Sequence, residues 1–277
     1  MKKILAIAVA LLCTYNTYAW SRALHAAVAA IAEDNLTEQA KQNITNALDG
    51  KSMVYHAQWL KDVGGTPEYA HTRAWRNVAM TPKGKLIVGK KAQKHAEPSI
   101  QKAQAYDALI AAVSAIESGN LNEKELADNI RYIITITADL HCPTHYIFTD
   151  MIEKRKSYYY YDGKKHRYDL YWENAAVKGT FSWRTNEFVH QLSRKTPEQV
   201  AQITKGSITS WITGNAPLYR DIYMMLDTGT SFDKKSLRNW QNKIYPISTE
   251  QIAVAGYRLA AILNGLFDSS VPNVKTK

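Results

Sequence analysis

Residues 249–267 (TEQIAVAGYRLAAILNGLF) form a long apolar stretch near the end of the chain, and their length and composition predict a C-terminal helix. A second helix is predicted near the start, where the alanine-rich residues 21–33 place Leu24, Val28 and Ile31 at helical spacing. Together the two stretches indicate a helical protein.

Helix-stop and helix-start signals support the same fold class. Asn35 is a candidate N-cap for a helix that ends before Gly50, and Asn122 opens another that Pro143 stops. Further helices are expected at residues 100–118, 168–177, 182–213 and 216–227, and a loop is expected at 146–167. The 13 glycines and 8 prolines are few, which argues against an all-β sandwich. The sequence therefore predicts a mainly α fold in a single domain, residues 20–277.

The composition is that of a globular protein with an excess of basic residues. Hydrophobic residues make up 45% and charged residues 22%, which excludes a disordered chain. There are 35 Lys and Arg against 25 Asp and Glu, which gives a net charge of +10. Because a basic surface attracts polyanions, an anionic partner is expected.

Residues 1–19 have the pattern of a signal peptide. Lys2 and Lys3 precede an unbroken apolar run, and Ala19 ends a small-x-small cleavage pattern. The run is much shorter than the roughly 20 residues that span a bilayer, so no stable membrane anchor is expected. Cleavage between Ala19 and Trp20 predicts a secreted or periplasmic protein. It lowers the net charge from +10 to +8, because both lysines leave.

Cys142 is the only cysteine expected in the mature chain, because Cys13 belongs to the signal peptide. An internal disulfide is therefore excluded. A chain of this length buries enough apolar surface without one, and a small buried residue is the simplest interpretation of Cys142.

Two parts of the chain combine groups that ligate metals. A free amine and carbonyl at Trp20 would lie about one helical turn from the imidazole of His25, and together these groups can chelate a cation. The motif ADLHCPTHY places Asp139, His141 and His145 at the end of a helix, with oxygen and nitrogen donors that suit zinc. In the alternative without a metal, His25 is structural and the other histidines lie near the negative end of a helix dipole.

Two further features follow in the chain. Asp169 and Glu173 are spaced i, i+4 and share one helix face, where a cation, a lysine or solvent must offset their repulsion. Residues 154–168 (KRKSYYYYDGKKHRY) interleave basic side chains, which bind phosphates, with tyrosines, which stack on unpaired bases. The candidate nucleic-acid contacts are Lys154, Arg155, Tyr158 and Tyr159. A soluble, partly buried loop is the alternative.

Taken together, these features resemble a known family. The order Trp20, His25, Asp139-x-His-x-Pro-x-His145 and Trp172 followed by a carboxylate is similar to the trinuclear-zinc, single-strand-specific nucleases. These are the mould nucleases and plant bifunctional nucleases, relatives of bacterial zinc phospholipase C. The end of the chain matches the family signature AG-x-RLA-x-LLN at Ala255, Gly256, Arg258, Leu259, Ala260 and Asn264. The resemblance implies a mainly α-helical fold with three zinc ions at the base of a cleft.

The resemblance implies that one of the three zinc sites is intact. The ligands of the third zinc are the amine and carbonyl of Trp20, His25, and Asp139, which bridges to the first zinc. At the second site His145 matches, whereas a His and an Asp of the family are replaced. The replacements are Asp169 and Glu173. The resulting nitrogen and oxygen donors still bind a divalent cation, and Mn²⁺, Mg²⁺ or Ca²⁺ competes better there with Zn²⁺.

The resemblance also implies that the first zinc site is lost. Its three private ligands are replaced by Lys61, Arg76 and Thr135. We expect Lys61 and Arg76 to lie where the first zinc would lie and to salt-bridge Asp139. A shift in register would instead let Asp62 and either His56 or His71 rebuild the site. Asn174 matches a position that is sometimes Asn in the family, where it could orient a phosphate oxygen, and it is, with Asp139, an implied catalytic residue.

Three functions are compatible with the resemblance. The first is an exported, monomeric, zinc-dependent phosphodiesterase with fewer than three zinc ions and reduced activity. It would act as an endonuclease or 3′-nucleotidase on single-stranded nucleic acid or nucleotides. The second is a non-catalytic homologue that binds phosphate or nucleic acid, with Lys61 and Arg76 in place of one zinc. The third is a phospholipase C-like hydrolase that acts on lipid headgroups.

Overall fold

The computed structural model describes residues 20–180 and 183–277, and it is 63% helical with two small sheets. The predicted mainly α class is therefore confirmed. The predicted signal peptide, residues 1–19, lies outside the described residues. Within the described part of the chain, no helix is both long enough and apolar enough to cross a membrane.

The helices of the described residues range from three residues to the 34 of α15. The first half contains α1 (Arg22–Asp34), α2 (Glu38–Ala47), α3 (Met53–His56), α4 (Trp59–Val63), η1 (Ala70–Ala74), α5 (Gly89–Gln93), α6 (Pro98–Gln101), α7 (Ala105–Ser118) and α8 (Glu123–Asp139). The second half contains η2 (Pro143–His145), α9 (Ile152–Arg155), α10 (Tyr168–Trp172), α11 (Ala175–Gly179), α12 (Thr185–Leu192), α13 (Pro197–Thr204), α14 (Ile208–Met224) and α15 (Lys234–Phe267).

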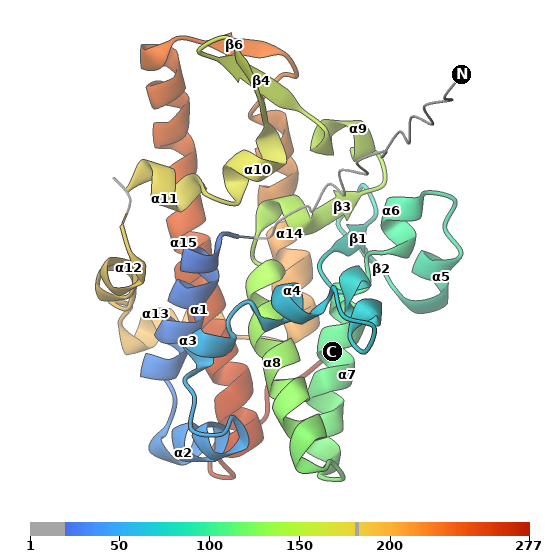
Figure 1. Ribbon diagram of the computed structural model, residues 1–277, viewed down its shortest axis with the longest axis vertical. Coiled ribbons are helices and arrows are strands. Elements are labelled where there is room, and N and C mark those ends of the chain that lie inside the picture. Colours follow the sequence, from blue (N-terminus) through green and yellow to red (C-terminus); the bar gives the residue numbers. More distant parts are fainter. Residues whose placement is uncertain (1–19, 181–182) are drawn as a thin grey trace, which may run out of the picture.

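The core is built around α15, which runs along the long axis of the molecule beside α1 and α8 (Figure 1). Leu24, Val28 and Ile31 of α1 are fully buried, as their spacing predicted. Gly256 of α15 lies directly against α1, since a Cβ there would approach Ile31 Cγ2 to 2.5 Å. Glycine at this position therefore allows the two helices to pack closely.

Asn264, the last residue of the family signature, joins α15 to the connection between α1 and α2. Its side-chain oxygen accepts from the Thr37 backbone N–H at 2.9 Å, and its amide donates to the Asn35 carbonyl at 3.0 Å. Thr37 is the N-cap of α2, whereas Asn35 ends α1 by donating to the Ile31 carbonyl. The predicted N-cap at Asn35 was therefore wrong by two residues.

Proline lies at several of the other errors in the predicted helix boundaries, whereas the helix predicted at 168–177 is divided into α10 and α11 at Glu173 and Asn174 without a proline. The C-terminal helix begins at Lys234, not at residue 249, and it continues through Pro246. In the same way α14 continues through Pro217. The predicted helix at 182–213 is divided among α12, α13 and the start of α14, with Pro197 opening α13. A proline inside a long helix removes one hydrogen bond, and tertiary packing offsets that loss.

Residues 146–167, which were predicted to be a loop, instead consist largely of strands and a short helix. They contribute β3 (Tyr146–Phe148), β4 (Tyr158–Tyr161) and β5 (Lys164–Arg167), which join β1 (Val78–Met80), β2 (Leu86–Ile87) and β6 (Thr230–Phe232) in two sheets. The strand orders are β2-β1-β3 and β5-β4-β6. Asp162 and Gly163 connect β4 to β5 with φ of 50° and 66°, the positive values that a two-residue hairpin turn requires. Aspartate followed by glycine was the sequence signal for this turn.

Gly256 gives a test of the α1–α15 contact. We expect Gly256→Ala to destabilise the protein by about 1–3 kcal/mol, because the added methyl group overpacks the interface with Ile31. Gly214 in α14 is the matched control, since nothing lies within 4 Å of its Cβ position. Gly214→Ala should stabilise the protein by about 0.5–1 kcal/mol. Urea unfolding measures both, and equal effects would contradict this account of Gly256.

Candidate functional site

Asp139 is a buried carboxylate at the C-terminal end of α8, with an exposed fraction of 1%. Its Oδ1 lies 3.3 Å from His25 Nε2, and its Oδ2 lies 3.7 Å from Arg76 Nε. Burial opposes ionisation, yet His145, His25 and Arg76 together hold the pKa of Asp139 below its ordinary value. The side chain is therefore an anion with an imidazole on one oxygen and a guanidinium on the other.

The start of α1 brings Trp20 to the same region. Trp20 is fully buried, and its carbonyl accepts from Gln58 Nε2 at 3.0 Å. The next residue, Ser21, donates its backbone N–H to the Glu173 carbonyl at 2.8 Å. These two bonds fix Trp20 and Ser21 between α4 and the end of α10, one helical turn from His25.

His145 lies in η2 and is held by a backbone carbonyl. Its Nδ1 contacts the Arg76 carbonyl, and only an N–H can donate to a carbonyl, so Nε2 carries the lone pair. Burial lowers the pKa of His145 to about 4. The ring is therefore neutral at physiological pH with Nε2 as its acceptor, the state in which an imidazole ligates a metal.

Two of the three predicted substitutions at the first zinc site place cations near Asp139. Arg76 pairs with it, and Lys61 on α4 lies close enough for its charge to act on Arg76, Glu173 and Asp139. Burial, followed by the charge of Arg76, lowers the pKa of Lys61. Thr135 is buried one turn before Asp139 on α8.

Asp169 and Glu173 differ in their surroundings although both belong to the α10 region. Arg167 donates to both carboxylate oxygens of Asp169, at 2.9 Å from Nε to Oδ1 and by a second contact from Nη2 to Oδ2. Glu173 is buried, and burial together with the charge of Asp169 raises the pKa of Glu173 to about 9. Asp169 is therefore paired with a guanidinium, whereas Glu173 is protonated at neutral pH.

The remaining residues that were predicted to contact phosphate or nucleic acid are partly buried or bound to other protein groups. Asn174 donates its amide to the Leu170 carbonyl at 3.5 Å, and Lys154 pairs with Asp227 at 3.5 Å. Arg155 reaches inward and donates to the Thr144 carbonyl at 3.2 Å, beside His145. Tyr159 is buried against Trp240 with ring centroids 5.4 Å apart, so its ring does not reach the surface. Tyr158 is only partly buried.

A buried pair that the sequence did not predict supports the segment between Asp139 and His145. His141 Nδ1 lies 2.8 Å from the Thr137 carbonyl, so Nε2 is free to accept from Arg258 Nη1 at 3.0 Å. Burial, with the charge of Arg258, lowers the pKa of His141 to about 3. The arginine of the family signature therefore anchors α15 to the end of α8. In the sequence, Arg258 was singled out by its position in the family signature.

The three residues considered for rebuilding the first zinc site lie elsewhere. Asp62 pairs with Arg22 at 2.9 Å on the surface, and the exposed His71 ring meets Trp75 edge-on. His56 is buried near Arg131, which precedes Asp139 by about 12 Å along α8. Across residues 20–180 and 183–277, no three His, Cys, Asp or Glu side chains are grouped so that they could hold a metal ion.

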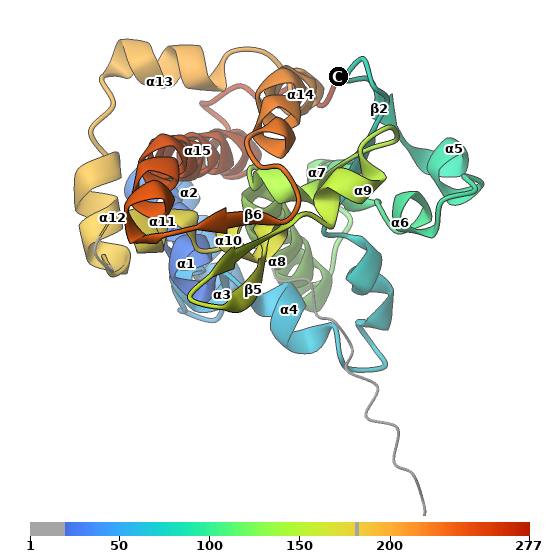
Figure 2. The same ribbon diagram turned by 90° about the horizontal axis from the view of Figure 1, so that it is seen from above.

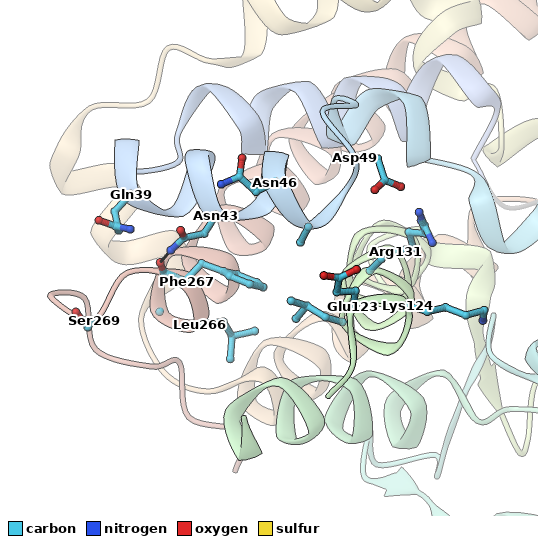
Figure 3. A pocket seen from close by; sticks show the side chains of 14 residues that line it. Gln39, Asn43, Asn46, Asp49, Glu123, Lys124, Arg131, Leu266, Phe267 and Ser269 are labelled. Carbon is cyan, nitrogen blue, oxygen red and sulfur yellow. Dashed lines mark hydrogen bonds between the residues drawn. The ribbon is translucent and has the colours of Figure 1, made fainter. Parts of the chain in front are cut away.

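A cavity of about 1100 Å³ lies at the other end of α8 from Asp139. Figure 3 shows Asn43 and Asn46 of α2, Glu123 at the start of α8 and Phe267 at the end of α15 along its walls. It contains none of the residues described above around Asp139, so it is not part of the candidate site.

The S1/P1 nuclease family model matches residues 20–268, nearly all of the described chain. The chain therefore belongs to the S1/P1 nuclease family, and the resemblance inferred from its motifs is confirmed. Membership supports a nuclease or phosphodiesterase function. No curated protein matches the chain.

His56 gives a test by pH. Burial, and after it the charge of Arg131, lowers the pKa of His56 from 6.5 to about 4. Between these pH values the unfolded chain binds more protons than the folded chain, so stability is lost as the pH falls from 6.5 through 4. We expect His56→Phe to remove this part of the loss. Urea unfolding across this pH range measures it, and an unchanged pH slope in the variant would contradict the assignment.

Proposed function

We propose that this member of the S1/P1 nuclease family is an exported, zinc-dependent phosphodiesterase with an altered metal centre. It would hydrolyse single-stranded nucleic acid or nucleotides more slowly than a trinuclear enzyme. The observation that carries the proposal is the arrangement at Asp139, with His25 Nε2 at 3.3 Å on one oxygen and Arg76 Nε at 3.7 Å on the other. The carboxylate thus keeps its imidazole partner and has a guanidinium where the first zinc is expected.

The donors at the start of α1 fit one zinc ion. His25 Nδ1 is buried without a hydrogen-bond partner, and the contact of Asp139 Oδ1 with His25 Nε2 at 3.3 Å is longer than an ideal hydrogen bond, so a cation would satisfy these groups better. The remaining donors are the main-chain amine and carbonyl of Trp20, so the site draws on fewer than three side chains. Zinc is suited to such nitrogen and oxygen donors.

A second ion would be held by His145, Asp169 and Glu173. His145 presents a neutral Nε2, and Glu173 would lose its proton when a cation binds. Asp169 would have to exchange the guanidinium of Arg167 for the ion. The second site is therefore weaker than the first, and oxygen-preferring cations such as Mn²⁺, Mg²⁺ or Ca²⁺ can compete there.

The cations of the chain would bind the scissile phosphate. Arg76 and Lys61 can clamp two of its oxygens and stabilise the charge that develops on them in the transition state. Neither group can deprotonate water while it is itself protonated. Bound zinc supplies that chemistry by lowering the pKa of water from 15.7 to about 7. The replacement of one zinc ion by two cationic side chains would therefore favour the binding of phosphate over its hydrolysis.

A non-catalytic phosphate-binding homologue is the second candidate function. The pairing of Asp139 with Arg76 and of Asp169 with Arg167 favours it, because both carboxylates are already neutralised without a metal. A phospholipase C-like hydrolase is a third, weaker candidate. A panel of heat-denatured DNA, 3′-nucleotides and phosphatidylcholine distinguishes the three.

The altered first site predicts the metal content. We expect the purified protein to hold at most two zinc ions per chain. The variant Lys61→Asp/Arg76→His/Thr135→His restores the family's ligands and should gain about one ion and at least tenfold in hydrolysis of denatured DNA. Plasma mass spectrometry counts the metals, and release of acid-soluble nucleotides measures hydrolysis.

A charge-matched variant is the control for this experiment. Lys83→Asp/Lys90→His makes the same change in net charge at two exposed positions and should alter neither metal content nor hydrolysis. Three zinc ions in the unaltered protein would contradict the proposal. Metal gained without any hydrolysis in the restored variant would favour the non-catalytic homologue.

The Trp20 site also predicts a dependence on processing. One additional residue before Trp20 converts its amine into an amide, which does not ligate zinc. We expect a chain that begins at Ala19 to bind one zinc ion fewer than a chain that begins at Trp20. Mass spectrometry of both intact chains under native conditions measures the difference, and equal metal content would remove Trp20 from the proposed ligands.

A further inference from the structure

The end of α14 is bonded to the segment that carries His145. Tyr223 donates its hydroxyl to the Tyr146 carbonyl at 2.9 Å, and Tyr146 directly follows His145 in the chain. The Tyr146 hydroxyl reaches back to α14, where it donates to the Ile212 carbonyl at 3.2 Å. The residue after His145 is therefore tied to α14 through both its main chain and its side chain.

The same turn of α14 is bonded to the segment that carries Asp169. Tyr168, which directly precedes Asp169, donates its hydroxyl to the Ile222 carbonyl at 2.5 Å. This carbonyl belongs to the last turn of the helix, where carbonyls lack an N–H donor four residues further on. Because Ile222 and Tyr223 are consecutive, one turn of α14 holds both segments of the candidate second site.

Both hydroxyl bonds are shielded from water. Tyr168 is fully buried, and the exposed fraction of Tyr223 is 1%. Burial raises the pKa of Tyr223 to about 12, and it also raises the pKa of Tyr168. Each hydroxyl therefore keeps its proton at neutral pH and donates it to its carbonyl. A buried carbonyl that loses its donor is costly, because water cannot replace the bond. We call Tyr168 and Tyr223 the tyrosine pair.

The helix provides a rigid reference for the two segments. Both α14 and α15 run along the long axis of the molecule (Figures 1 and 2), and α14 packs against η2 and β3. Glu173 follows the position of Asp169, since its N–H donates to the Asp169 carbonyl at 3.2 Å. The separation of His145 from the two carboxylates is therefore referred to two adjacent residues, Ile222 and Tyr223.

We infer that the tyrosine pair are positioning residues, which set the spacing between His145 and Asp169 and thereby select the cation of the second site. This inference rests on the proposed function for the existence of that site. Mg²⁺ requires oxygen ligands in near-ideal geometry, whereas Ca²⁺ accepts a flexible arrangement with longer bonds. A site whose segments are less firmly held should therefore lose Mg²⁺ more readily than Ca²⁺.

The ratio of the affinities for these two cations tests the inference. The protein is loaded with one equivalent of Zn²⁺ and then with Mn²⁺, and Mg²⁺ or Ca²⁺ displaces the Mn²⁺, whose free form is followed by electron paramagnetic resonance. We expect Tyr168→Phe and Tyr223→Phe each to weaken Mg²⁺ binding about tenfold, and Ca²⁺ binding less than about threefold. Because both cations are titrated on the same folded protein, a loss of stability alone does not change the ratio.

Tyr106 on α7 provides the matched control. Its buried hydroxyl lies 2.7 Å from Thr209 Oγ1, so it also bonds to α14, but about 20 Å from Tyr223 along the helix. Tyr106→Phe removes a hydroxyl in the same way and should leave both affinities unchanged. In every variant the affinity for the first Zn²⁺ should also stay unchanged, since its candidate ligands lie on other segments.

A second measurement needs no metal. His145 Nδ1 donates its proton to the Arg76 carbonyl, and nuclear magnetic resonance of the metal-free protein records how fast this proton exchanges with water. We expect Tyr223→Phe to accelerate the exchange about tenfold, because the segment opens more often, and Tyr106→Phe to leave it unchanged.

Two results would overturn the inference. The first is an unchanged ratio of Mg²⁺ to Ca²⁺ affinity in both variants of the tyrosine pair, and the second is an unchanged exchange rate of the His145 proton in Tyr223→Phe. If the unaltered protein binds no second cation, the proposed metal centre fails instead. The exchange rate alone then decides whether the tyrosine pair positions His145.

Discussion

The burial of an ionised carboxylate at the end of α8 constrains much of this structure. Asp139 lies at the negative end of a helix dipole and is almost without solvent, and both conditions disfavour its charge. Its ionisation therefore requires positive or hydrogen-bonding partners from other segments. His25 comes from α1 and Arg76 follows η1, and the Arg76 carbonyl is in turn held by His145 of η2. Segments far apart in the chain thus converge on one side chain.

The packing of α15 keeps these segments in place. Gly256 allows α1 to approach closely, which positions His25, and Asn264 holds the connection that follows α1. Arg258 donates to His141 midway between Asp139 and His145. Gly256, Arg258 and Asn264 of this helix therefore each have a structural explanation. These residues of the family signature lie outside the site and support the segments that carry its side chains.

The sequence predicted the helical core better than the segments around the site. Leu24, Val28 and Ile31 repeat at helical spacing, and Asn122 opens α8 as predicted, with a capping box to Glu125. The β4–β5 hairpin was missed because four consecutive tyrosines show no alternation, although Tyr159 and Tyr160 face opposite sides. The pairing of Arg167 with Asp169 was not predictable from spacing, since it depends on how β5 turns into α10.

The two oxygens of Asp139 explain how a metal centre of this family can lose one ion without losing the whole site. On our proposal, Oδ1 serves the ion shared with His25, whereas Oδ2 faces Arg76 in place of the first zinc. A bridging carboxylate that lost one cation outright would leave one buried oxygen uncompensated, which is costly. A guanidinium supplies that positive charge without requiring ligands of its own. On this proposal Arg76 would preserve the charge balance of Asp139, and the capacity to activate water would be reduced.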